Sequence, residues 1–180
     1  MRPLPGAPAG APGFDEPLEM LEACHGRIEA QLATLERLVA HLAARGADAE
    51  AAQAAQAVMR YFDTAGVLHH RDEDEDLFPL LRSLAAERGR PEIAATIDEL
   101  EREHASMDAL WGELRAALDA VAGGRGPRLG AEAVARFAWL YRRHMEREAS
   151  AVLPFARQAL AAEKRAALGE RMAARRRIAT

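Results

Sequence analysis

Apolar residues recur every three or four positions along most of the chain, which is the spacing of one face of an α-helix. In the first such stretch the apolar positions are Leu18, Leu21, Ile28, Leu32, Leu35, Val39 and Leu42. Comparable spacing predicts four long helices, over residues 15–44, 49–87, 91–121 and 131–160. A shorter amphipathic segment at 163–177 ends in three arginines and is predicted to be a last helix.

Three short segments rich in glycine and proline separate the four long helices, at residues 45–48, 88–91 and 123–127. These residues are the strongest turn signals in a sequence, and short turns place consecutive helices side by side and antiparallel. The chain is therefore predicted to be all-α: an up-down-up-down four-helix bundle over residues 15–162, then a short C-terminal helix and tail at 163–180.

Four histidines stand at matching distances from these turns: His25, His69, His104 and His144. The midpoint of each consecutive pair falls at or beside a turn, so each histidine is as far from its turn as its partner is. Antiparallel neighbours then bring all four imidazoles to one level of the bundle. Chance placement would rarely produce this agreement.

Two of these histidines are followed one helical turn later by a glutamate, in His69–Glu73 and again in His144–Glu148. Residues four positions apart lie on the same face of a helix. The second pair follows the first by 75 residues, and flanking phenylalanine and proline residues repeat with the same offset. The pattern indicates two copies of a helical hairpin, related by a pseudo-two-fold axis.

Four imidazoles and two carboxylates at one level of a core point to a metal centre. Buried carboxylates without partners cost several kcal/mol each, and cations remove that penalty. Imidazole and carboxylate ligands without a thiolate suit iron, manganese or zinc. Six ligands exceed the four of one tetrahedral zinc, so two ions bridged by the glutamates are expected. The predicted ligands are His25, His69, Glu73, His104, His144 and Glu148.

These residues resemble the hemerythrin-like (HHE cation-binding) family. The resemblance extends over residues 18–160 and is carried by segments 24–29, 69–79, 101–104 and 144–154. It implies a four-helix bundle that holds a non-haem centre of two iron ions with an oxo or hydroxo bridge, which makes manganese and zinc the less favoured metals. Members of the family are associated with oxygen binding, oxygen or iron sensing, the nitric oxide response and repair of damaged iron centres.

The resemblance predicts a protein that binds O2, NO or peroxide at its metal centre, for storage, sensing or detoxification under oxidative or nitrosative stress. The first alternative is a di-iron enzyme that consumes peroxide or repairs iron-sulfur clusters, and the second is an iron- or oxygen-sensing regulatory module. Oxygen-carrying members have another histidine one turn after the position of His104, where this chain has Asp108. Fewer histidines leave more open metal positions, which favours redox turnover or NO binding over reversible oxygen carriage.

Four more residues are candidate ligands: His70, Asp108, Glu22 and Glu101. His70 is a fifth ligand, a residue that orients a ligand, or a solvent-facing residue. The two glutamates each precede a histidine by three residues, as in ferritin-like di-iron bundles, but they are expected at the surface. The acidic run at 72–76 is expected to be solvated apart from Glu73.

Composition fits this picture. The chain has 180 residues, enough for one domain with its own core, and 49% of them are apolar. Much of that share is alanine and β-branched residues are few, which favours closely packed helices over a sheet. Residues 1–14 carry four prolines and three glycines and are predicted to be a disordered lead-in.

Charge and cysteine usage limit the partners and the location. A net charge of -4 gives no reason to expect nucleic acid or a membrane surface as a partner. No apolar run approaches the ~20 residues of a membrane span, and the first residues lack the apolar region of a secretory signal. The single cysteine, Cys24, excludes an internal disulfide and is compatible with a reducing cytosol. We expect a soluble cytoplasmic protein, either a monomer or a weak homodimer.

Overall fold

The computed structural model describes residues 12–125 and 129–178, and within these ranges the regular structure is entirely helical. In chain order the elements are α1 (Pro17–Arg45), α2 (Ala49–Tyr61), η1 (Phe62–Gly66), α3 (Val67–Asp72), η2 (Glu73–Leu77), α4 (Phe78–Glu87), α5 (Pro91–Ala122), α6 (Ala131–Arg147), η3 (Glu148–Val152), α7 (Leu153–Ala159) and α8 (Ala162–Ile178). The elements labelled η are π-helical segments.

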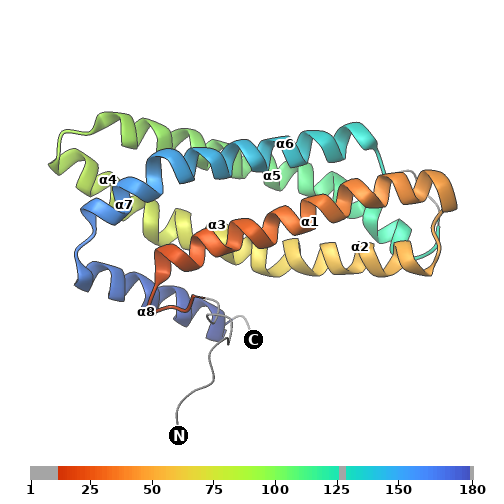
Figure 1. The fold of residues 1–180 in the computed structure, drawn as a ribbon, viewed down its shortest axis with the longest axis horizontal. Helices are drawn as coiled ribbons and strands as arrows, with labels where there is room; N and C mark the ends of the chain where they lie inside the picture. The colour runs from red at the N-terminus through yellow and green to blue at the C-terminus, as the bar shows by residue number, and fades with distance from the viewer. Residues whose placement is uncertain (1–11, 126–128, 179–180) are drawn as a thin grey trace, which may run out of the picture.

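These elements form four long rods that lie side by side, with consecutive rods running in opposite directions (Figure 1). The first rod is α1, the second runs from α2 to α4, the third is α5, and the fourth runs from α6 to α7. The rods close into a ring, because α1 and α5 each pack against both α2 and α6. A glycine with positive φ stands at each turn: Gly46, Gly89 and Gly124. The predicted all-α, up-down-up-down bundle is confirmed.

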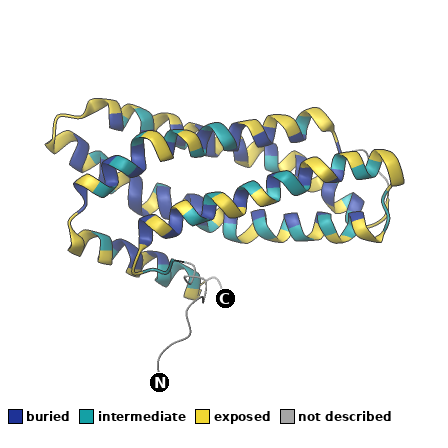
Figure 2. Ribbon diagram, viewed as in Figure 1, coloured by how far each residue is buried: buried dark blue, intermediate teal, exposed yellow. Residues whose placement is uncertain are grey.

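The apolar core consists of two clusters, one at each end of the bundle. Buried residues follow the inward face of every rod (Figure 2). On each rod the predicted histidine level separates the two clusters; on α1, for example, Leu21 belongs to one cluster, Ile28 to the other, and His25 lies between them. The polar level is thus a layer across the middle of the core.

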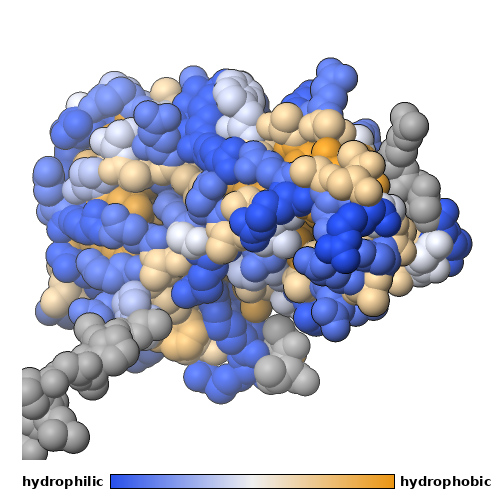
Figure 3. Space-filling view, turned by 45° about the vertical axis from the view of Figure 1, so that its right-hand side comes forward, coloured by the Kyte–Doolittle hydropathy of each residue, from blue (hydrophilic) through white to orange (hydrophobic). Residues whose placement is uncertain are grey.

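Hydrophilic side chains cover most of the outer surface on the face shown in Figure 3, and apolar side chains gather there only in small patches. Among the described residues the exposed large apolar side chains are Val67, Trp139 and Ile178. No helix of the described chain combines the length and apolar character needed to cross a membrane.

The second and fourth rods are interrupted by π-helical turns at equivalent places. Segments η2 and η3 each begin at the glutamate of a His-x-x-x-Glu pair and end just ahead of Pro79 or Pro154. Proline has no N–H to donate, and its ring crowds the carbonyl group four residues earlier. A wider π turn relieves that conflict within the helix. Ahead of each proline the helix therefore contains a π turn, and this turn begins at the glutamate of the His-x-x-x-Glu pair. Segment η1 contains no proline, and no residue pattern predicts it.

Helix α8 packs against α1, α3 and η2, beside the amino-terminal end of α1 (Figure 1). Its Leu168 and Met172 are fully buried in one of the two core clusters. Asp72 and Asp76 face this helix and are buried, so the expectation that the acidic run is solvated apart from Glu73 is wrong for both. The burial arises because arginines of α8 pair with these two carboxylates.

Disorder is predicted for residues 1–14, and of these, residues 1–11 lie outside the described residues. Phe14 is described and packs against the core cluster that α8 shares. The guanidinium group of Arg176 lies 5.2 Å from the centre of its ring. The chain entering α1 is therefore in contact with α8.

Gly169 permits this contact, because a Cβ atom at that position would overlap the carbonyl oxygen of Phe14. We expect Gly169→Ala to lower the free energy of unfolding by about 1–3 kcal/mol, as overpacking usually does. Urea denaturation measures the change. Gly112→Ala is the matched control, since no atom lies within 4 Å of a Cβ there, and it should leave stability unchanged or slightly raised. Equal stability of the two variants would contradict the packing.

Candidate metal centre

The structure brings all six predicted ligands together in the polar layer of the bundle. They come from all four rods: His25 from α1, His69 from α3, Glu73 from η2, His104 from α5, His144 from α6 and Glu148 from η3. Five of them are buried to 3% exposure or less, and His25 is partly buried. The antiparallel packing of the rods thus places the side chains at one level, as the turn positions predict.

Glu73 lies between two histidines of different rods. Its Oε1 is 3.2 Å from Nε2 of His69, and its Oε2 is 3.3 Å from Nε2 of His104. A single carboxylate therefore offers one oxygen to each of two neighbouring imidazoles.

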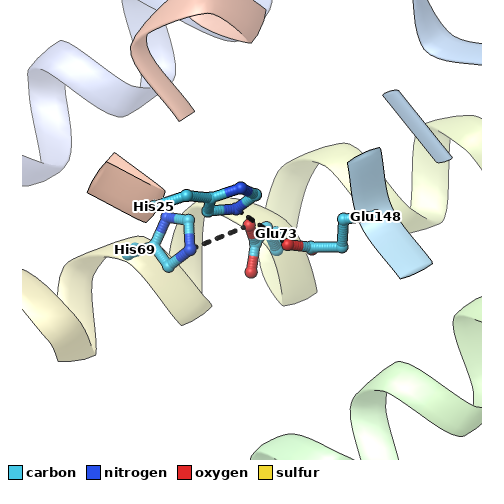
Figure 4. A group of neighbouring side chains, drawn as sticks. All are labelled: His25, His69, Glu73 and Glu148. Carbon is cyan, nitrogen blue, oxygen red and sulfur yellow. Dashed lines mark ion pairs between the residues drawn. The ribbon is translucent and has the colours of Figure 1, made fainter. Parts of the chain in front are cut away.

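Glu148 repeats this arrangement from the opposite rod. Its Oε2 is 2.9 Å from Nε2 of His25, and its Oε1 is 3.6 Å from Nε2 of His144. The imidazoles of His25 and His69 lie beside Glu73 and Glu148 (Figure 4).

Within the polar layer, potential ligand atoms gather in two groups, the atoms of each lying within 4.8 Å of one another, and Glu73 belongs to both. The first group is His25, His69, Glu73 and Glu148, and the second is Glu73, His104 and His144. One histidine pair thus lies on each side of the two carboxylates.

Several atoms of this layer are buried without a hydrogen-bond partner among the described residues: Nε2 of His25 and the Oε2 atoms of Glu73 and Glu148. Nε2 of His25 and Oε2 of Glu148 are close to each other, but their contact does not have the geometry of a hydrogen bond. Buried polar atoms are normally paired, and an unpaired carboxylate in a core is costly. Cations between the two histidine pairs would satisfy all three atoms. The donor set of imidazole nitrogen and carboxylate oxygen suits iron, manganese or zinc.

Two further carboxylates orient the ligands of the second group. Nδ1 of His104 is 2.8 Å from Oδ1 of Asp74, and Nδ1 of His144 is 3.2 Å from Oε2 of Glu103. A carboxylate that accepts from Nδ1–H leaves Nε2 unprotonated and directed at the metal, as is usual for metal-bound histidines. Arg143 in turn donates to Glu103 at 2.8 Å.

Sequence reasoning missed these two residues. Glu103 carries a readable signal, because it stands between Leu100 and Met107 on the apolar face of α5, where a carboxylate needs a partner. Asp74 carries no such signal, because all five residues at 72–76 are acidic and nothing in the sequence distinguishes Asp74 from its neighbours.

The layer is strongly coupled electrostatically in the metal-free chain. Burial lowers the pKa of His69 to about 3. Burial and the charge of Glu148 raise the pKa of Glu73 well above its ordinary value. Burial opposes protonation of His144, but the charge of Glu148 and the hydrogen bond to Glu103 outweigh it and raise the pKa of His144 to about 9. At neutral pH the layer therefore holds protons that metal ions would displace.

The raised pKa of His144 predicts that the metal-free protein loses stability in mild alkali. Protonated His144 stabilises the fold fully below its unfolded pKa of 6.5, and this contribution is lost as pH rises through about 9. We expect the free energy of unfolding to fall by roughly 3 kcal/mol across that window, by urea denaturation. The loss should be much smaller in His144→Gln and in metal-saturated protein, whose ligand imidazoles are already neutral. An identical pH dependence in all three samples would refute the assignment.

Glu22 and Glu101 do not join the centre and lie toward the surface, as expected from the sequence. Glu22 is exposed and lies 2.6 Å from a guanidinium nitrogen of Arg157. Glu101 is partly exposed, and its Oε1 lies 2.7 Å from Nη1 of Arg82. Each points out of the bundle, and the arginine is its partner.

His70 lies beside the centre and belongs to neither ligand group. Its ring stacks on that of His104, with centroids 4.0 Å apart and planes at 19°. A metal lies in the plane of an imidazole ligand, about 2.0–2.1 Å from the nitrogen, so two stacked rings cannot direct their lone pairs at one ion. Asp108 is largely exposed and lies 3.9 Å from Nδ1 of His70. In this geometry neither residue joins the two groups of potential ligand atoms.

The fold and site define a helical-bundle domain that binds metal cations through histidine and carboxylate side chains. Residues 16–156 match the model of the hemerythrin HHE cation binding domain, and the chain belongs to this family. A relative from Haemophilus influenzae, described only as an uncharacterized protein, is 30% identical over 165 residues, which is 92% of each chain. Family membership confirms the resemblance read from the sequence, and with it metal binding.

Proposed function

We propose that the protein binds two iron ions, one beside His25 and His69 and one beside His104 and His144. The observation that carries this proposal is that Glu73 and Glu148 each direct their two oxygens at histidines of different pairs. Three metals suit these donors, and the family resemblance favours iron over manganese and zinc.

We further propose that the two irons bind a small ligand, O2, NO or peroxide, for storage, sensing or detoxification in the cytoplasm. Each ion would receive two imidazole nitrogens and two carboxylate oxygens from the protein. Iron accepts more ligands than four, so positions remain open for a small molecule. Asp108 stands where oxygen-carrying members have a histidine, and the open positions that result favour NO binding or redox turnover over reversible oxygen carriage.

A di-iron enzyme that consumes peroxide is the second candidate. It is favoured by the same open positions and by a small cavity beside the centre, which His70, Asp108 and Tyr141 line together with apolar residues. Steady-state peroxide consumption distinguishes turnover from simple binding, and transfer of iron to an apo iron-sulfur protein tests a repair role.

The test is the metal content of the protein after anaerobic loading with ferrous iron and desalting, by inductively coupled plasma mass spectrometry. We expect two irons per chain, and one in each of His25→Ala and His104→Ala, which disrupt different ion positions. Retention of a single ion by the wild type, or of none, would overturn the two-iron proposal.

A further inference from the structure

A small cavity lies beside the metal centre, bounded by η1, α3, α5 and α6. Its volume is about 20 Å³, somewhat more than the ~10–15 Å³ that one water molecule needs. Val67 and Asp108 line it and are exposed, whereas His70 and Tyr141 line it and are buried. The cavity therefore extends from the surface of the bundle into its polar layer. We call it the His70 cavity.

His70 lines the His70 cavity, and neither nitrogen of its ring has a hydrogen-bond partner among the described residues. Nε2 of His70 is buried and has no hydrogen-bond partner among the described residues. Nδ1 of the same ring is 3.9 Å from Asp108, which is too far for a hydrogen bond. An unpaired imidazole nitrogen in a core indicates a missing partner that can donate or accept.

Tyr141 supplies a second polar group to the same cavity. Its ring stacks on that of His70, with centroids 5.7 Å apart and planes at 20°. Burial, with the charges of Asp108 and Glu73, raises the pKa of Tyr141 well above its ordinary value. The hydroxyl group therefore stays protonated and is available as a donor.

The His70 cavity is separated from the metal ligands by the thickness of one imidazole. His70 stacks on His104 at 4.0 Å, and its ring centre is 6.3 Å from that of His144. A molecule held here is thus next to the proposed position of the second ion.

We propose that the His70 cavity binds one molecule of hydrogen peroxide next to the ion beside His104 and His144. This inference rests on the proposed function and names the ligand of that site. Hydrogen peroxide both donates and accepts hydrogen bonds, so it can pair with His70, Tyr141 and Asp108 together. O2 and NO cannot satisfy these groups, and burying polar groups unpaired is unfavourable.

The test uses two variants that change the cavity without touching a proposed ligand. Tyr141→Phe removes one hydroxyl group. Gly66→Ala adds a methyl group to the cavity wall, 3.3 Å from Cδ1 of Phe62. The matched controls are Tyr61→Phe, outside the cavity lining, and Gly112→Ala, whose methyl group meets no atom within 4 Å.

Stopped-flow absorbance on the iron-loaded proteins gives the second-order rate constant for hydrogen peroxide, after iron content has been checked. We expect it to fall about fivefold in Tyr141→Phe, the effect of one hydrogen bond, and at least as far in Gly66→Ala. The controls should match the wild type. The rate constant for NO should stay within about twofold in Tyr141→Phe, because NO gains little from that hydroxyl group.

A second readout needs no metal. Titration of metal-free protein with hydrogen peroxide should shift the ring resonances of His70 in NMR spectra, and Gly66→Ala should suppress the shift.

Wild-type protein that holds iron but does not react with peroxide would refute peroxide as the ligand in the proposed function. Wild-type reaction with cavity variants equal to their controls would refute the His70 cavity alone. Loss of iron in Tyr141→Phe would assign that residue to the metal centre and also overturn the inference.

Discussion

Replacing Glu148 by glutamine should remove both metal ions from the protein. The carboxylate lies between His25 and His144, one from each proposed ion position, so both positions lose an anionic oxygen. An amide has the shape of the carboxylate but no charge, and it is a much weaker ligand. Changes in residues that only orient ligands already cost 10–100-fold in metal affinity, so we expect a loss of more than about 100-fold here.

The control for this substitution is Glu146→Gln, two residues away on the exposed side of the same rod. It removes the same charge from the chain and should retain two ions. Metal content after desalting measures both variants, and circular dichroism shows that each is folded. Retention of one ion by Glu148→Gln would mean that Glu148 serves a single ion and does not bridge.

The fold and the six clustered side chains follow from information that is local in the sequence. Helical spacing sets the rods, glycine sets the turns, and equal distances from the turns set the level of the histidines. The spacing of His69 and Glu73 then fixes a shared face without knowledge of any partner helix. For these reasons the main site residues could be predicted before any contact was known.

The remaining features depend on contacts between distant segments. Asp72 pairs with Arg175 and Arg176, about one hundred residues later, and nothing in an acidic run marks one member for burial. Whether His70 ligates or lines a cavity depends on the rotation of α3 against α5, because its ring stacks on His104. The π turn at η1 has no proline to announce it. Such features are properties of packing, and helical periodicity carries no information about them.

Arg175→Ala is expected to be strongly destabilising, although Arg175 lies outside the metal centre. Asp72 is fully buried, and its Oδ1 lies 2.5 Å from Nη1 of Arg175. The same guanidinium group pairs with Asp76 at 2.6 Å. Removing one partner of a buried ion pair leaves an uncompensated charge and costs about 3–5 kcal/mol. In this variant Arg176 still pairs with Asp72, and Arg171 still pairs with Asp76. We therefore expect a loss at the lower end of this range, about 3 kcal/mol.

A double-mutant cycle separates this charge effect from lost packing of the long arginine side chain. If the uncompensated carboxylate is the cause, adding Asp72→Asn to Arg175→Ala should restore a large part of the lost free energy of unfolding. Lys164→Ala, an exposed change on the same helix, should stay within about 0.5 kcal/mol of the wild type. Because Asp72 directly precedes Glu73, Arg175→Ala should also weaken metal binding. Additive effects of the two substitutions, with metal affinity unchanged, would show that α8 neither neutralises Asp72 nor supports the metal centre.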